Sequence, residues 1–402
     1  MNLYSKIKRE LHENPAWNYY GHTVCNPLHS QEDAKKFVLD YFEAGSKEKV
    51  LSPWNVSSND KGRLFREIHT VNVFFIGVYL QSIIGVCTIK SNRKVAGNYE
   101  FPYLWYLTSL GHDLGYMYET KTDIVEKLDG ELLNENSGRY RLLVYKALGF
   151  DIKKMAPNLP IDNRTCYGKA CNFGRVPCTY KPCYNLCKGC IEFNNNIKIK
   201  KSWCGINIKE NYFKYRIKEF GCIDHGIAGA DMLYSNLIDN YIEKYKSDNG
   251  ICFMEFTDDK DRSFSCEQFK IFAYISDCIA CHNIYKADKE RIDLYKKYGL
   301  EKLLPDNYKK ISYEKNPLLF ILCLADTLEP SKRFESVEMI KVLEQIDIEY
   351  SYGQYLRVKI NESLTYNSGF EKYKKDIEGL TEWMEIGNIK VEIVKPSNNE
   401  KM

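Results

Sequence analysis

Apolar and polar residues recur with a helical period along most of this chain. The clearest example begins at Gly62, where one face repeats every three or four residues: Phe65, Ile68, His69, Val71, Asn72, Phe75 and Ile76. This spacing predicts an amphipathic helix whose inward face carries His69. Further helices are predicted over the ranges 32–42, 139–148, 269–285 and 317–326, with a charged helix ending near 133.

Two of these helices place a titratable residue among apolar neighbours. In the range 269–285 one stripe holds Ile271, Ile275, Cys278 and His282, so the imidazole is expected at the buried end. The helix 317–326 is almost entirely apolar and ends in Asp326. A carboxylate in such surroundings must be paired or bind a metal ion, because leaving it bare is costly.

The pattern changes from helical to mixed after about residue 340. The ranges 346–350 and 355–360 alternate like the strands of a hairpin around Tyr352-Gly353-Gln354. A helix over 370–385 and a strand over 389–394 follow. We therefore predict a small α+β module over residues 341–402.

The composition is that of an ordinary soluble protein. Of 402 residues, 44% are hydrophobic and 28% are charged, and the formal net charge is +3. A charge this close to zero gives no strong electrostatic argument for nucleic-acid binding. No apolar run reaches the ~18 residues of a membrane span, and the N-terminus lacks the apolar core of a signal peptide. We expect a cytoplasmic protein without a membrane partner.

Seven of the fifteen cysteines lie in one short segment: Cys166, Cys171, Cys178, Cys183, Cys187, Cys190 and Cys204. In a reducing compartment such a cluster indicates metal ligation rather than disulfides. The C-x2-C spacing of Cys187 and Cys190 lets two thiolates share one ion. We predict a structural zinc site in the segment 161–209. Thiols without metal and an iron–sulfur cluster are the alternatives, and the Lys residues around the cluster could contact phosphate.

A second group of candidate ligands is built around Leu110-Gly111-His112-Asp113-Leu114-Gly115. The neighbouring imidazole and carboxylate can reach the same divalent ion if the turn directs both inward. Another helix is predicted to begin at His225, after Asp224, whose side chain suits an N-cap. The candidate ligands therefore follow the order His69, His112-Asp113, His225, His282 and Asp326.

This order resembles the H…HD…H…H…D pattern of the HD-domain superfamily of metal-dependent phosphohydrolases. The stretch 110–115 resembles the signature turn of that family, and His225-Gly226-Ile227-Ala228-Gly229-Ala230 resembles its H-G-x-x-G-A helix start. Residues 324–333, Leu-Ala-Asp-Thr-Leu-Glu-Pro-Ser-Lys-Arg, are similar to a stretch of the HD group that cleaves symmetrical dinucleoside tetraphosphates. The resemblance covers roughly 60–160 and 210–340.

The resemblance implies a mainly α fold with an HD-type helical core over 61–160 and 210–340. Residues 1–60 would form a helical lead-in, 161–209 a Cys-rich insertion and 341–402 the α+β appendage. His69, His112, Asp113 and Asp326 match the first metal site of the family. Asp113 would bridge to a second ion bound by His225 and His282. The sequence does not distinguish among Fe, Mn, Zn, Co and Ni as the bound metal.

The implied function is the hydrolysis of a phosphoester or phosphoanhydride in a nucleotide or another phosphorylated small molecule. Asp113 would be catalytic through the metal site, and Lys332 and Arg333 would stabilise phosphate charge. Three features depart from the family: Tyr116 stands where many relatives have Lys, about 110 residues separate Asp113 from His225, and no Gly-Tyr-Pro follows His282. A single-stranded nuclease and a non-catalytic nucleotide sensor are the alternative functions.

Overall fold

The computed structural model describes residues 1–13, 61–85, 88–90, 98–119, 140–150, 203–249, 266–334, 338–351 and 353–395. These ranges contain eleven α-helices, a two-stranded ribbon and a three-stranded sheet. The predicted mainly α composition is confirmed at this level. No helix in the described ranges is both long and apolar enough to cross a membrane.

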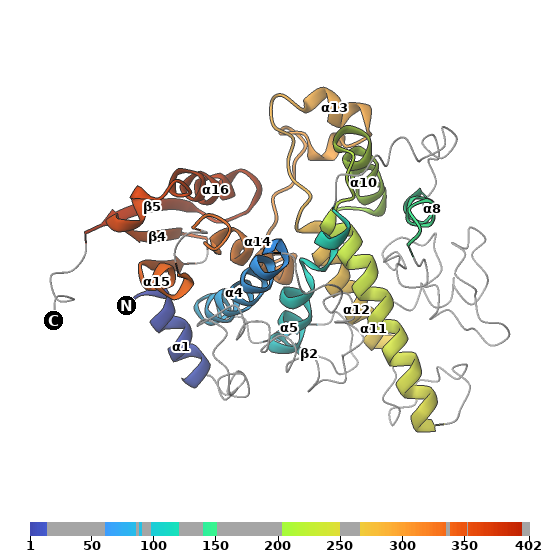
Figure 1. Cartoon of the computed structure of the whole chain (residues 1–402), viewed down its shortest axis with the longest axis horizontal. Coiled ribbons are helices and arrows are strands. Elements are labelled where there is room, and N and C mark those ends of the chain that lie inside the picture. Colours follow the sequence, from blue (N-terminus) through green and yellow to red (C-terminus); the bar gives the residue numbers. More distant parts are fainter. Residues whose placement is uncertain are drawn as a thin grey trace.

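Five helices form the centre of the molecule (Figure 1): α4 (Lys61–Ile84), α5 (Phe101–Gly111), α11 (His225–Asn249), α12 (Cys266–Cys281) and α14 (Pro317–Leu328). Helix α14 is buried along most of its length, because its residues are apolar on every side. Pro317 fits the first turn, where its missing N–H is not needed. Helices α4, α11, α12 and α14 correspond to the predicted ranges that begin at 62, 225, 269 and 317, whereas α5 was not predicted as a helix.

Close packing between α4 and α5 depends on Gly77. A Cβ built at Gly77 would lie 1.9 Å from Cζ2 of Trp105, so only glycine leaves room for the indole. The Trp105 ring nitrogen donates to the carbonyl of Phe74 at 2.9 Å. This contact fixes the two helices that carry His69 and lead into His112.

The helix α8 (Tyr140–Ala147) matches the predicted range 139–148, whereas α10 (Ile206–Phe220) was not predicted. The buried Lys209 interrupts the apolar period of α10 and donates to Asp277 of α12 at 2.5 Å. A buried Lys is tolerated only with such a partner. Helix α10 begins at the end of the predicted insertion and packs with the helical core.

A buried ion-pair network joins α8, α10 and α11. The Arg141 guanidinium donates to both carboxylate oxygens of Asp231 at 2.9 Å and to Glu210 at 2.5 Å. The hydroxyl of Tyr145 donates to the same Asp231 at 2.8 Å. The network positions α11, which carries His225 at its first residue.

The C-terminal unit has the predicted order of hairpin, helix and strand. Strands β3 (Ile346–Ser351) and β4 (Tyr355–Asn361) pair antiparallel, α16 (Phe370–Trp383) crosses over, and β5 (Asn388–Val394) pairs parallel to β4. The helix α15 (Met339–Glu344) precedes the sheet. Alternate residues of β3 and β4 are buried, so one face of the sheet packs on the protein and the other faces solvent.

The N-terminal helix α1 (Leu3–Glu13) packs against both α4 and the C-terminal unit. Lys6 and the Tyr79 hydroxyl of α4 both donate to the carbonyl of Ile348, at 2.9 and 2.8 Å. Lys6 also forms an ion pair with Asp347. The described part of the predicted lead-in therefore ties the sheet to the helical core.

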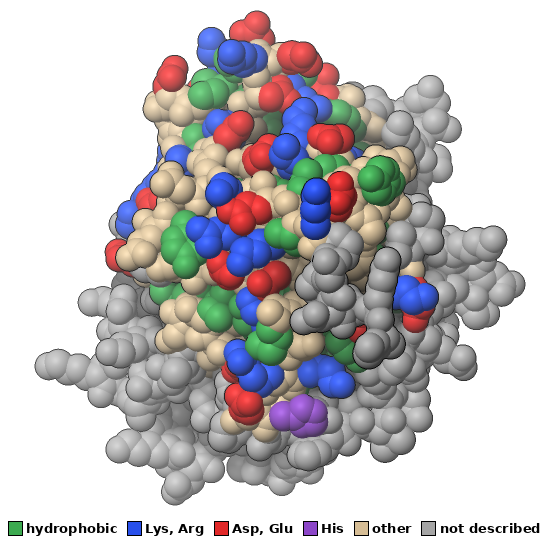
Figure 2. All heavy atoms as spheres, turned by 90° about the vertical axis from the view of Figure 1, so that its left-hand side faces the viewer, with side chains coloured by type: hydrophobic (Ala, Val, Ile, Leu, Met, Phe, Trp, Pro, Cys, Tyr) green, Lys and Arg blue, Asp and Glu red, His purple; other side chains and the backbone are tan. Residues whose placement is uncertain are grey.

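The remaining elements are short: β1 (Thr88–Lys90), β2 (Asn98–Glu100), α13 (Ile292–Lys297) and the 3-10 turns at 114–118, 301–303 and 362–366. The predicted helices over 32–42 and ending near 133 lie outside the described residues. The face on the left of Figure 1, where the sheet lies, intermixes Lys and Arg with Asp and Glu (Figure 2). Among the described residues of this face, no broad region carries one charge sign (Figure 2).

Candidate metal centre

The structure brings together the six residues of the predicted constellation. His69 comes from α4, His112 and Asp113 from the turn after α5, and Asp326 from α14. His225 opens α11 and His282 follows α12. Five of the six are buried, and Asp326 is the partly exposed one. Elements far apart in sequence therefore meet at one buried point.

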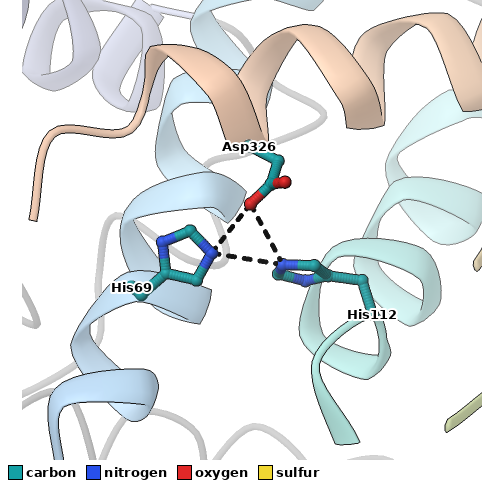
Figure 3. A group of neighbouring side chains, drawn as sticks. All are labelled: His69, His112 and Asp326. Atoms are coloured by element: carbon teal, nitrogen blue, oxygen red, sulfur yellow. Dashed lines mark hydrogen bonds and ion pairs between the residues drawn. The ribbon is translucent and has the colours of Figure 1, made fainter. Parts of the chain in front are cut away.

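One group of ligand atoms consists of His69, His112 and Asp326 (Figure 3). The Nε2 atoms of the two imidazoles are 3.3 Å apart. The Asp326 Oδ1 atom lies 2.9 Å from Nε2 of His69 and 3.7 Å from Nε2 of His112. The three side chains point toward one another from three separate elements, so they could hold a single ion.

A second group consists of His112, Asp113 and His282, whose ligand atoms all lie within 4.8 Å of one another. Asp113 of this group also faces two further histidines: its Oδ2 is 3.5 Å from His69 Nε2, and its Oδ1 is 3.8 Å from His225 Nε2. The rings of His225 and His282 are 5.2 Å apart between centroids. The described side chains thus provide two ligand groups that share His112, and Asp113 of the second group also faces His69 and His225.

Each of the four histidines uses Nδ1 to donate a hydrogen bond away from the centre. His112 donates to the Ser109 carbonyl and His282 to the Ile279 carbonyl, both at 2.6 Å. Because a carbonyl only accepts, Nδ1 carries the proton in both rings. This tautomer leaves the Nε2 lone pair free to bind a metal, as in many histidine metal sites.

Carboxylates orient the other two histidines. His69 Nδ1 donates to Glu329 at 2.5 Å, and His225 Nδ1 donates to Glu119 at 2.7 Å. Glu329 also accepts from Asn72 at 3.0 Å and from the Ser331 hydroxyl at 2.7 Å. Glu119 is held in turn by an ion pair with Arg216.

The donor set fits divalent metal ions. Without a metal ion or a proton between them, the two Nε2 lone pairs 3.3 Å apart would repel each other. This separation is close to that of two nitrogens bound to one ion at about 2.1 Å each. Both oxygens of buried Asp113 have no hydrogen-bond donor among the described residues. A buried carboxylate needs compensating charge, which the Lys332 ammonium supplies in part from 3.7 Å and which a metal ion bound directly to Asp113 would complete.

The protonation states of the candidate ligands are compatible with metal binding. Burial disfavours the ionised form of Asp113, but the neighbouring His112, Lys332 and His69 outweigh it and lower the pKa of the carboxyl well below its usual range. Burial and the neighbouring His225 and His112 lower the pKa of His282 to about 3, so its imidazole stays neutral. Burial and Lys332 oppose protonation of His69, but Glu329 and Asp326 raise its pKa to about 9. Without metal, a proton on His69 partly neutralises Asp326.

Sequence reasoning did not assign roles to Glu329 and Glu119. Glu329 lies three residues after Asp326, which places both on one side of a helix end, and this spacing was the available signal. Glu119 follows the turn at 114–118, and nothing in its sequence context marks it.

Replacing Glu329 by Gln is expected to weaken metal binding about 10- to 100-fold, because His69 loses the carboxylate that orients it. Metal titration of metal-free protein by calorimetry measures the change. Glu344→Gln, an exposed residue of α15, is the matched control and should bind metal like the wild type. Equal affinity in Glu329→Gln would mean that this carboxylate does not orient a ligand.

Lys332 and Arg333 were both predicted to contact phosphate, but they lie differently. The Lys332 ammonium is 3.3 Å from Asp326 and 3.7 Å from Asp113, and it lies over the Tyr116 ring. The Arg333 guanidinium instead donates to Asp376 of α16 at 2.9 and 2.6 Å. Neighbouring residues of a turn project in different directions, so the geometry favours Lys332 alone for the predicted role.

Tyr116 lies in the turn that follows Asp113. Its ring stacks on His225 with centroids 3.8 Å apart and an angle of 12° between the planes. The stack holds the imidazole flat against the turn that carries Asp113. Tyr116 therefore helps to position His225, and Lys332 supplies a cation on the same side of the site.

Glycines bring the His-Asp turn onto the start of α11. A Cβ built at Gly115 would lie 1.9 Å from the His225 carbonyl oxygen and 2.5 Å from the Gly229 nitrogen. Asp224 caps the helix, because its Oδ1 accepts from the Ile227 N–H at 2.9 Å, as predicted. The close backbone contact brings His225 within reach of Asp113.

Of the cysteines in the predicted zinc site, only Cys204 belongs to the described residues. It is buried, and its Sγ lies 3.4 Å from Sγ of Cys281 on α12. Cys166, Cys171, Cys178, Cys183, Cys187 and Cys190 lie outside the described residues. The zinc site in the Cys-rich segment stays a prediction.

Comparison with known proteins finds no relative: no protein-family model, no curated protein and no solved structure matches this chain. The resemblance to HD-domain proteins therefore rests on the motifs, and the functional argument rests on the geometry of the candidate metal centre.

Proposed function

We propose that this protein is an HD-type phosphohydrolase that uses two divalent ions at the candidate metal centre. The observation that supports the proposal is that three histidines and two aspartates form two ligand groups that share His112, with His225 facing Asp113 beside them. A buried polar core without a metal function would pair these groups with hydrogen-bond donors. Asp113 has no such donor among the described residues.

In this proposal His69, His112, Asp113 and Asp326 hold one ion, and His225 and His282 hold the other with Asp113. When bound, such ions supply Lewis acidity, which neutralises charge on a phosphoryl group and lowers the pKa of a nearby water. Glu329 and Glu119 keep the imidazoles of His69 and His225 in the metal-binding tautomer. The apolar helices around the centre exclude bulk water and strengthen these interactions.

Lys332 is the residue best placed to bind the anionic part of a substrate. Its side chain is 28% exposed while its ammonium lies beside Asp326 and Asp113, so it borders both solvent and the centre. Burial opposes its positive charge, but Asp113 and Asp326 raise its pKa above the usual range, which keeps it protonated at neutral pH. A phosphate group of a nucleotide or of another small molecule suits this cation.

Lys332→Met is expected to lower turnover about 100- to 1,000-fold, because one preorganised cation beside the developing charge is lost. Arg333→Met is the matched control, since it removes a neighbouring cation that is paired with Asp376 outside the centre. Initial rates on bis-p-nitrophenyl phosphate measure both variants. Equal loss in the two variants would assign the effect to stability instead of catalysis.

Turnover by metal-loaded protein tests the proposal as a whole. Chain loaded with Mn²⁺ or Fe²⁺ should hydrolyse bis-p-nitrophenyl phosphate, and a panel of nucleotides should identify better substrates. Loaded metal without turnover of any phosphate compound would contradict the enzymatic function and favour a nucleotide sensor. Nuclease activity would require strongly salt-dependent binding of oligonucleotides. The mixed charges of the face in Figure 2 give no support for such a surface there.

A further inference from the structure

Strand β5 forms an open edge of the three-stranded sheet. In the described part of the chain it pairs only with β4, so its other side presents unpaired backbone groups. Such an edge is a ready template for pairing with another strand. Ile393 is 54% exposed and Val394 37% exposed, and together they are two of the six exposed large apolar side chains in the described ranges. The edge is therefore both unpaired and partly apolar.

The two faces of β5 carry different residues. Ile389, Val391 and Ile393 continue the buried rows of the sheet, and Ile393 is in register with Ile360, which is completely buried. Lys390 and Glu392 lie on the opposite, charged face. Ile389 and Val391 are partly buried against the core, and the apolar face becomes exposed at Ile393.

The sequence of β5 is complementary to itself. If two copies pair antiparallel about Val391, Lys390 of each copy faces Glu392 of the other, and Ile389 faces Ile393. Opposite charges and branched apolar residues directly across two strands are stabilising pairs. Within one chain Lys390 is in register with Arg357, a like charge, and it forms an ion pair with Glu392 at 2.7 Å, which the pairing of two copies would exchange for ion pairs between the chains.

We propose that β5 is a self-association edge through which two copies of this chain join their sheets antiparallel about Val391. The pairing extends each three-stranded sheet into a continuous six-stranded sheet and covers Ile393. The closed two-fold arrangement uses the same surface on both copies. The mixed charge of this side of the molecule favours a copy with alternating charges over a polyanionic partner (Figure 2). One strand per copy makes a small interface, so the dimer is concentration-dependent.

Charge exchange on β5 provides the test, with the full-length chain in sedimentation velocity runs over a concentration series. The wild type should move from monomer to dimer as its concentration rises. Lys390→Glu and Glu392→Lys alone each place like charges opposite one another, and each should weaken dimerisation about tenfold or more.

A mixture of the two single variants separates the interface from folding defects. In a mixed pair, the two lysines of one chain face the two glutamates of the other, so an equimolar mixture should dimerise like the wild type. The double variant Lys390→Glu/Glu392→Lys should also dimerise, because it is again complementary to itself. The proposal is overturned by a wild type that stays monomeric, by single variants that dimerise unchanged, or by a mixture that stays monomeric. None of these outcomes depends on enzymatic activity.

Discussion

Asp113→Asn is expected to abolish turnover, with a loss of at least about 1,000-fold, while the protein remains folded. Asp113 is the one carboxylate that faces both ligand groups, and both of its oxygens lack hydrogen-bond donors in the described structure. The amide has the same size, so the packing stays intact, but it offers one neutral oxygen instead of two anionic ones. Both ions would lose a ligand at once. A metal centre without its shared ligand binds its ions more weakly and no longer activates water normally.

The experiment compares initial rates on bis-p-nitrophenyl phosphate with thermal unfolding of the same samples. Asp376→Asn is the matched control, because its carboxylate pairs with Arg333 outside the centre. That control should retain most of the activity. Near-normal rates in Asp113→Asn would show that the carboxylate is not part of the catalytic machinery.

Gly115→Ala is expected to destabilise the protein by about 3 kcal/mol and to remove metal binding, as inserting atoms into a tightly packed site does. The added methyl would lie 1.9 Å from the His225 carbonyl oxygen, and both sides of this contact are backbone. To relieve this overlap, the turn that carries His112 and Asp113 must move away from α11. That movement takes Asp113 away from His225 and disrupts the arrangement of both ligand groups.

Gly379→Ala is the matched control, because no heavy atom lies within 4 Å of the methyl group added at this position in α16. It should leave metal binding unchanged and stabilise the protein by about 0.5–1 kcal/mol through helix propensity. Urea unfolding and metal titration measure both variants. Wild-type stability in Gly115→Ala would contradict the close backbone contact on which the site geometry depends.

Those site residues could be predicted that the sequence pattern alone distinguishes from their neighbours. His69, His282 and Asp326 are polar residues within apolar helical patterns, and burial makes such residues conspicuous. The adjacent His112 and Asp113 mark a turn. The structure brings all of them together, as the order of motifs predicted.

The partners of these residues could not be predicted in the same way. Glu119 and Glu329 are two among 54 acidic residues, and only the fold distinguishes them. Helix α10 was missed because Lys209 breaks its apolar period, and the ion pair that makes its burial tolerable comes from Asp277 of another helix. Arg333 stands next to Lys332 in sequence, but its direction depends on the turn and on Asp376.

Long-range packing was also beyond the sequence pattern. The hairpin, helix and strand of the C-terminal unit were predicted from local periodicity. The docking of α1 onto that unit depends on contacts between Lys6 and residues more than 300 positions away. No spacing rule connects residues so far apart.

Elemental analysis of the purified protein tests the two-ion centre most directly. Wild type, Asp113→Asn and His282→Gln are measured side by side, so that any zinc in the Cys-rich segment contributes equally to all three. We expect two fewer ions per chain in Asp113→Asn than in the wild type, and one fewer in His282→Gln. Identical metal content in the three proteins would contradict the account, because the six side chains would then be a buried polar core without bound metal.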